Sequence, residues 1–267
     1  MFPSQIPTAH VVKSTVRAAL KDRFFTASVA ALCPIMTGVM LYVLLGGLAI
    51  VIPGRFEWAL LLIFIGCFVL LLHPVILGAV RYFWRFTDGI TESPTEVFHY
   101  FSNVFLYTRA LKCILLILFK FVTAVLTCML PYLVVTIISN AWLYQFLGKE
   151  IPLWVAGLSL LQSFLKFVGI IASLAVISRY YLFPAVAVMD DETLLLEAVH
   201  ISVMVSRRTV TAFLGLIFSL LGWIILSNFW LPLVYTAPLL LGSYVVHSRY
   251  AIVNYNQSLE FYAKENY

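Results

Sequence analysis

The stretch from Thr209 to Ser248 reads TVTAFLGLIFSLLGWIILSNFWLPLVYTAPLLLGSYVVHS, and none of its 40 residues is Asp, Glu, Lys or Arg. A single membrane span needs about 20 apolar residues. Ser227, Asn228 and Pro232, which are residue types that favour turns, lie near the middle of the stretch. The stretch therefore predicts a tight hairpin of two membrane spans.

The rest of the chain has the same character. Of its 267 residues, 63% are hydrophobic and 11% are charged, whereas a soluble domain carries about 25% charged residues. The uncharged runs predict six spans, at 25–52, 58–80, 113–138, 153–178, 209–227 and 231–248. The predicted fold class is therefore all-α, a single polytopic membrane helix bundle over residues 1–267.

The basic residues indicate how the spans are oriented. With the N-terminus inside, thirteen of the 17 basic residues lie on the inner side and two, Arg55 and Lys149, on the outer side. The remaining two, Lys120 and Lys166, fall within spans. Lys and Arg concentrate in cytoplasmic loops, so both termini are predicted to be cytoplasmic. Basic flanks that contact anionic lipid account for the net charge of +5, so no nucleic-acid partner is expected.

An amphipathic stretch precedes each predicted pair of spans. The three stretches are residues 10–25, 93–112 and 191–208. In the first, Lys13, Arg17 and Lys21 recur every four residues opposite an apolar face, which predicts a helix lying in the membrane interface. In the second, Ser93 and Glu96 have the spacing of a capping box. Each stretch is therefore interpreted as a cytoplasmic-side amphipathic helix.

Short matches between these stretches predict a threefold repeat. RAALK at 17–21 precedes the first predicted span, and RALK at 109–112 precedes the third. The proposed copies, each an interfacial helix followed by a membrane hairpin, are residues 9–82, 93–181 and 190–255. Parallel repeats of this kind are related by an axis along the membrane normal.

The acidic cluster Asp190, Asp191 and Glu192 has two interpretations. Acids at the start of a helix and Arg207 and Arg208 at its end are the arrangement that the helix dipole favours. The cluster is therefore read first as the capped start of an interfacial helix. The alternative is a contact with a cytoplasmic ligand or partner.

Two Glu-x-x-His pairs, Glu96 with His99 and Glu197 with His200, have the spacing found in di-metal carboxylate sites. Such sites need two further inward carboxylates, and the predicted spans contain no Asp or Glu. No metal and no other cofactor is therefore expected. No nucleophile elbow, P-loop or dinucleotide fingerprint occurs, so the chain is not predicted to be an enzyme.

Three polar residues lie inside predicted spans, where ionisable groups are often functional. Lys120 lies close enough to the inner boundary for its side chain to reach the interface, whereas Lys166 lies near the midplane. Lys166 therefore has a structural and a functional interpretation. His73, followed by Pro74, is read first as a histidine at a helix kink whose hydrogen bonds are satisfied.

Residues 181–226 resemble a bacterial family of six-span integral membrane proteins, number 975 among the domains of unknown function. The matching positions are Tyr181, Pro184, Asp190 or Asp191, Glu197, Ala198, Ser202, Gly222, Trp223 and, beyond that segment, Pro238. The early ALKDRFF also resembles the family's N-terminal basic-aromatic motif. Where the family tends to have a glycine, Arg207 and Arg208 follow Ser206. The resemblance implies an all-helical protein of the bacterial inner membrane, with no established activity.

The sequence thus predicts a non-enzymatic membrane protein whose cytoplasmic-side helices contact phospholipid, especially anionic lipid, or another membrane protein. The candidate contact residues are Lys13, Arg17, Lys21, Arg109, Lys112, Arg207 and Arg208. The alternative is a small-solute transporter or channel, with Lys166, Lys120 and His73 lining its path.

Overall fold

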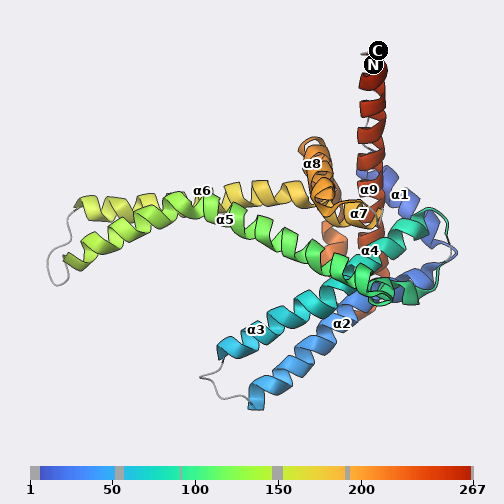
Figure 1. Ribbon diagram of the computed structural model, residues 1–267, viewed down its shortest axis with the longest axis horizontal. Helices are drawn as coiled ribbons and strands as arrows, with labels where there is room; N and C mark the ends of the chain where they lie inside the picture. The colour runs from blue at the N-terminus through green and yellow to red at the C-terminus, as the bar shows by residue number, and fades with distance from the viewer. Residues whose placement is uncertain (1–6, 52–56, 91, 146–152, 190–192, 266–267) are drawn as a thin grey trace. The chain divides into compact units, whose positions relative to one another are not determined.

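A computed structural model describes residues 7–51, 57–90, 92–145, 153–189 and 193–265, and every element in these ranges is helical (Figure 1). Within them, five helical segments are long and apolar enough to cross a membrane. They are Phe24–Leu48, Trp58–Thr87, Val104–Ala141, Gly157–Met189 and Leu195–Leu226. The all-α prediction is confirmed, and the five segments indicate a multi-pass membrane protein.

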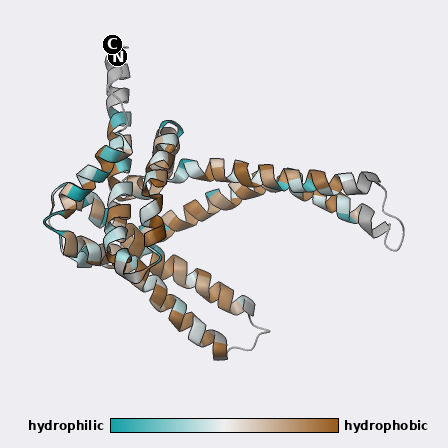
Figure 2. Ribbon diagram, turned by 180° about the vertical axis from the view of Figure 1, so that it is seen from behind, coloured by the Kyte–Doolittle hydropathy of each residue, from teal (hydrophilic) through white to brown (hydrophobic). Residues whose placement is uncertain are grey.

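The chain forms two compact units, which are described separately. The first unit comprises residues 1–114 and 182–267, and the second comprises residues 115–181. Figure 2 shows the α2–α3 and α5–α6 hairpins as mostly hydrophobic, whereas hydrophilic residues gather around the turn after α4. Charge is thus concentrated at one end of the α2–α4 helices.

The sixth predicted span lies in α9 (Trp230–Glu265), which is not among the five segments. Its apolar stretch is interrupted by Thr236, Ser243 and His247, and all three side chains are buried. α9 packs against α1, α2, α4 and α8. It is therefore the central helix of the first unit, and its polar residues face protein. That it crosses the membrane stays a prediction.

α1 (Ala9–Leu20) forms the first amphipathic helix, and its apolar side chains Val12, Val16 and Leu20 are buried. A Cβ added to Gly242 of α9 would lie 2.8 Å from Cγ1 of Val16, so the glycine allows the two helices to approach closely. The apolar face that the sequence assigned to lipid thus packs against protein. Contact of α1 with lipid through its polar face stays a prediction.

α2 (Phe24–Val51) runs antiparallel to the segment formed by α3 (Glu57–Cys67), η2 (Phe68–Leu72) and α4 (His73–Thr87). η2 is a wider π-helical turn directly before Pro74.

Proline lacks an N–H and its ring displaces the carbonyl four residues earlier. That carbonyl belongs to Leu70, and it accepts a 3.0 Å hydrogen bond from the Tyr107 hydroxyl. A π-helical turn therefore precedes His73 and Pro74, and the Leu70 carbonyl is bonded; the kink itself stays a prediction.

η3, a 3₁₀ helix over Pro94–Phe101, crosses α4 at Gly78. A Cβ on Gly78 would lie 1.8 Å from the carbonyl oxygen of Val97. Only glycine lets the two backbones meet at this distance. Around the crossing, Phe83 and Tyr100 are almost completely buried, so the core of the first unit lies here.

The second and third predicted interfacial helices take other forms. Residues 93–112 divide into η3 and the start of α5 (Val104–Gln145). The Ser93 hydroxyl accepts from the Thr95 amide at 3.4 Å, while the Glu96 carboxylate lies beside Arg81. Ser93 therefore caps the helix as predicted, whereas Glu96 forms an ion pair with Arg81.

Residues 195–226 form one continuous helix, α8. The reading of Arg207 and Arg208 as the end of a separate helix is wrong, because both lie in its interior. The apolar periodicity continues through them, so nothing stops the helix there. The three proposed copies therefore begin differently, and the threefold repeat stays a prediction.

α7 (Phe183–Met189) is a short helix of the first unit that precedes α8 in the chain. Its side chains Phe183, Ala185 and Val186 are fully buried. It packs against α4 and α8. The sequence analysis assigned no helix to this segment, which lies between the predicted span 153–178 and the stretch 191–208. Because a buried core helix and a lipid-facing helix are both apolar, composition alone did not distinguish them.

The turn predicted between α8 and α9 is confirmed at Ser227–Phe229. Ser227 and Pro34 of α2 line one groove of about 420 Å³. α2 continues for 17 residues beyond Pro34, which corresponds to about 25 Å. The α8–α9 turn therefore lies beside the first half of α2, well short of its far end.

The second unit is a helical hairpin made by α5 from residue 115 onward, α6 (Leu153–Ile177) and the short η4 (Ser178–Tyr180). Gln162 donates to the hydroxyl of Thr136 at 2.9 Å. Most of the large apolar side chains along both helices are exposed. The hairpin predicted for the third and fourth spans is therefore present.

Candidate functional site

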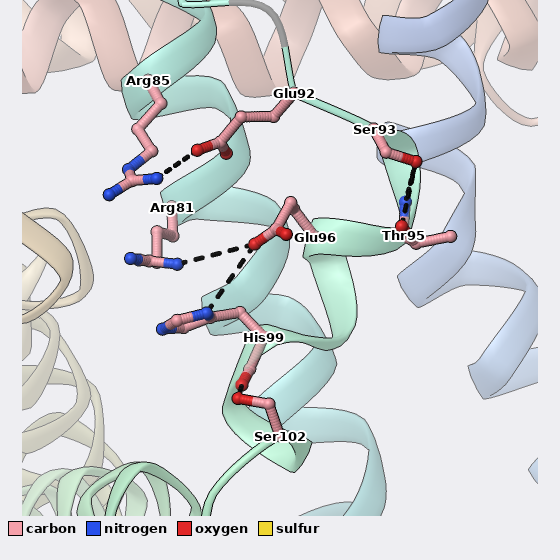
Figure 3. Close-up of polar contacts among 8 residues, drawn as sticks. All are labelled: Arg81, Arg85, Glu92, Ser93, Thr95, Glu96, His99 and Ser102. Carbon is pink, nitrogen blue, oxygen red and sulfur yellow. Dashed lines mark hydrogen bonds and ion pairs between the residues drawn. The ribbon is translucent and has the colours of Figure 1, made fainter.

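An ion-pair cluster joins α4 to η3 (Figure 3). Arg85 pairs with Glu92, and Arg81 lies 3.8 Å from the Glu96 carboxylate. Nδ1 of His99 lies 3.7 Å from the same carboxylate. Arg81 is only 8% exposed, so its charge depends on this partner. The cluster holds η3 on α4 beside the Gly78 crossing.

This cluster was not predicted from the sequence, although a signal for it exists. Arg81 and Arg85 are four residues apart on one helical face, and Glu92 and Glu96 are also four apart. Matched spacing of opposite charges on either side of a turn predicts this kind of pairing.

The turn after α4 is fastened by arginines from two other helices. Arg23, just before α2, donates to the carbonyl of Gly89 at 3.1 Å. Arg249 of α9 pairs with Asp88, and its guanidinium lies 4.9 Å from the centre of the Trp84 ring. Asp88 faces an arginine, as Glu92 and Glu96 do, so these charges stabilise the fold.

Two of the predicted contact residues are directed inward. Arg109 of α5 donates to the carbonyl of Thr193 at 2.8 Å and to that of Ala187 at 3.4 Å. The Ala187 carbonyl lies near the C-terminus of α7, where a cation is favourable, while Thr193 directly precedes the N-cap residue of α8. Arg109 therefore positions α7 and the start of α8.

Lys13 is the second residue of this kind. Its Nζ donates to the carbonyl of Ser219 at 3.1 Å, which ties α1 to α8. The other predicted contact residues are exposed, and they are Arg17, Lys21, Lys112, Arg207 and Arg208. The structure thus leaves five of the seven available to solvent or lipid headgroups.

A hollow of about 260 Å³ lies on the polar face of α1, lined by His10, Lys13, Ser14 and Arg17. A lysine and an arginine provide positive charge, and the serine provides a hydroxyl. Arginine binds phosphate oxygens in a bidentate manner, and lysine acts as a compact charge. These charged groups attract phosphate, but the surface that lines the hollow is almost entirely apolar, and Lys13 is already bonded to the Ser219 carbonyl.

The three polar residues predicted to lie within the membrane, His73, Lys120 and Lys166, are divided between the two units. His73 is buried at the start of α4, and its Nε2 has no hydrogen-bond partner among the described residues, so the reading of His73 as a satisfied histidine is wrong for this atom. Lys120 of α5 is half-buried, whereas Lys166 of α6 is exposed. His73 belongs to the first unit and both lysines to the second, so a common path stays a prediction.

The register of the α5–α6 hairpin separates the two lysines. The Phe121 and Tyr180 rings lie 6.2 Å apart, so Lys120 lies level with the end of α6. Lys166 lies about twelve residues before that level, a distance of about 18 Å along the helix. The two charges therefore occupy different depths of the hairpin.

The acidic cluster Asp190, Asp191 and Glu192 lies outside the described residues. Of the two Glu-x-x-His pairs, Glu197 and His200 are exposed on α8, and the other pair belongs to the ion-pair cluster. Within the described part of the chain, His, Cys, Asp and Glu side chains do not gather in groups of three that could hold a metal ion.

The groove between α2, α4 and α9 has a different lining. Small apolar residues, among them Ala31, Ala79 and Ala237, leave its volume of about 420 Å³ open. Ser227 is one of its few polar lining residues. The lining of the groove is therefore mostly apolar.

No protein-family model matches the chain, and no similar protein was found among curated sequences or solved structures. The resemblance to the six-span membrane family therefore stays a prediction. The chain's own residues carry the case for its function.

Proposed function

We propose that this chain is a non-enzymatic protein of the bacterial inner membrane that binds anionic phospholipid headgroups on its cytoplasmic side through α1. The basic face of α1, formed by Lys13 and by the exposed Arg17 and Lys21, carries the proposal. Its residues are those that recognise phosphate, and the anionic lipids of a membrane surface present phosphate at this level.

The packing of α1 supports this function. Val12, Val16 and Leu20 are buried in the first unit, and Lys13 is bonded to the Ser219 carbonyl. The polar face of α1 is therefore held in one orientation before any lipid binds. Binding to such a preorganised face loses little conformational entropy. The exposed Lys21 extends the basic face one turn beyond the hollow.

The proposed topology places both termini in the cytoplasm. It departs from the six predicted spans in one respect: the α8–α9 hairpin, whose turn lies beside the first half of α2, enters the membrane only part of the way. Supporting this depth, the Ser227 hydroxyl donates to the Ile224 carbonyl at 2.6 Å, and the Asn228 amide donates to the Ile225 carbonyl at 3.0 Å. A turn within the membrane needs its carbonyls bonded in this way.

Cysteine labelling tests the topology. In a chain whose native cysteines are replaced, a cysteine at Asn228 is expected to resist a membrane-impermeant maleimide applied from outside. A cysteine at Arg55, in a predicted outer loop, should react. Equal labelling of both positions would show that the α8–α9 turn reaches the outer surface.

Lipid titration tests the function. Thermal unfolding of the purified protein in neutral detergent is followed while phosphatidylglycerol or phosphatidylcholine is added. A ligand that binds the native state raises the unfolding temperature, and phosphatidylglycerol is expected to raise it more. The variant Arg17→Gln with Lys21→Gln leaves the Lys13 bond intact. At about 1 kcal/mol for each basic residue, its affinity for the anionic lipid should fall roughly 30-fold.

The matched control carries Arg55→Gln and Lys149→Gln, which remove the same charge from the predicted outer loops. This control is expected to bind phosphatidylglycerol as the unmodified chain does. An equal loss in both double variants would mean that net charge, and not α1, attracts the lipid. No loss in the α1 variant would refute the proposal.

A further inference from the structure

Lys166 lies at the centre of α6, an apolar helix. Thirteen residues separate it from Leu153, where α6 begins, and thirteen separate it from Arg179. At 1.5 Å per residue, each interval is about 20 Å, while the hydrocarbon core of a bilayer is about 30 Å thick. Lys166 is therefore near the midplane, and it is exposed on the helix. Lipid headgroups lie beyond the reach of its side chain.

The chain supplies no anion at this depth. None of the six predicted spans contains Asp or Glu. This is true of the spans in both units, so it holds however the units are arranged. A lysine facing hydrocarbon alone is unfavourable by several kcal/mol, and intramembrane cations are usually paired with a carboxylate or with carbonyls. A carboxylate partner would therefore have to come from another molecule.

The surroundings of Lys166 favour a helix as that partner. Ser159, Ser163 and Lys166, at positions i, i+4 and i+7, form one exposed stripe of α6. The Ser163 hydroxyl donates to the Ser159 carbonyl at 3.0 Å, so it lies folded against its own helix. Two small residues four apart let the backbone of another transmembrane helix approach closely.

The stripe is distinct from the face that packs inside the hairpin. Gln162 contacts Thr136, and Gly169 lies against Met129. The stripe flanks this face, since successive residues of a helix turn by 100°. A further helix can therefore lie along the stripe without displacing α5.

We infer that the stripe Ser159–Ser163–Lys166 is a docking surface for a transmembrane helix of a different membrane protein, one that carries an Asp or Glu near the bilayer midplane. Charge complementarity decides against a second copy of this chain, because its own spans hold no carboxylate. The inference does not depend on the lipid function of α1, which concerns the other unit.

A pair of synthetic helices tests the inference. Each is a Leu-Ala transmembrane peptide with lysine ends, and the two differ by Glu or Leu at the central position. The full-length protein and the peptide are labelled with donor and acceptor fluorophores in vesicles of neutral lipid, and energy transfer is measured against peptide density. The Glu peptide is expected to associate at least tenfold more tightly than the Leu peptide.

Variants of the protein test whether Lys166 causes the preference for the Glu peptide. Lys166→Leu should abolish it, Lys166→Arg should keep it, and Lys120→Leu should leave it unchanged because Lys120 lies at the end of the hairpin. Size-exclusion chromatography before reconstitution shows that each variant is folded.

Equal association of the two peptides, or a preference that survives Lys166→Leu, would overturn the inference. Self-association that disappears in Lys166→Leu would overturn it as well, since the stripe would then belong to an interface between copies of this chain.

Discussion

The first unit and the α5–α6 hairpin each have a glycine where two helices pack closely, but the glycines contact different kinds of atoms. Gly78 in the first unit touches backbone, because a Cβ there would lie 1.8 Å from the Val97 carbonyl oxygen. Gly169 in the α5–α6 hairpin faces mainly a flexible side chain, with Sδ of Met129 at 2.9 Å and the Cys128 carbonyl at 3.0 Å. The first contact has no room to adjust, whereas methionine can change its rotamer.

The charged side chains of the two regions also differ, because several of those of the first unit are paired and Lys166 of the hairpin is exposed. In the first unit, Arg81, Arg85 and Arg249 each face a carboxylate. In the hairpin, Lys166 is exposed on an apolar helix. The paired charges of the first unit stabilise its own fold, whereas the exposed Lys166 of the hairpin is available to bind another molecule.

The largest effect is expected for Gly78→Ala. The added methyl group must displace the η3 backbone, so we expect a loss of about 3 kcal/mol or more in unfolding free energy, at the upper end for overpacking. Thermal unfolding in mild detergent measures the change. Gly46→Ala is the control, because a Cβ at that position would meet no neighbouring atom within 4 Å, and it should be neutral or slightly stabilising. Equal stability of the two variants would contradict the crossing described at Gly78.

A smaller effect is expected for Arg109→Ala. This change leaves the carbonyls of Thr193 and Ala187 without their charged donor, and hydrogen bonds to charged groups contribute about 1.5–3 kcal/mol. Lys112→Ala, three residues along α5 and exposed, should change the unfolding free energy by less than about 0.5 kcal/mol. If both variants melt alike, Arg109 does not position α7.

The smallest effect is expected for Gly169→Ala in the hairpin. Met129 must move aside and the Cys128 carbonyl must shift slightly, which costs about 1 kcal/mol, the lower end for overpacking. The higher helix propensity of alanine offsets part of this loss. The same melting assay should place this variant between the Gly46 and Gly78 variants. A loss as large as that of Gly78→Ala would remove the distinction between the two regions.

Much of the helical architecture could be predicted from uncharged runs. The turn at Ser227–Phe229 follows from the length of the run around it, and the α5–α6 hairpin follows in the same way. Composition does not separate lipid-facing from protein-facing apolar residues, however. For that reason the burial of α7 and of the apolar face of α1 was missed.

The candidate site could be predicted in part. The basic face of α1 follows from the spacing of Lys13, Arg17 and Lys21. The inward direction of Lys13 and Arg109 could not be predicted, because each bonds to carbonyls distant in the sequence. Every residue has a backbone carbonyl, so the sequence does not show which one accepts a hydrogen bond. Only the folded structure shows which cationic side chains bond to carbonyls within the protein.

Native mass spectrometry of the protein, extracted gently from its own membrane, tests the proposed function most directly. We predict a retained anionic phospholipid on the unmodified chain that is lost from the variant carrying Arg17→Gln and Lys21→Gln. A bare protein, or an anionic lipid retained equally by both, would contradict lipid binding at α1.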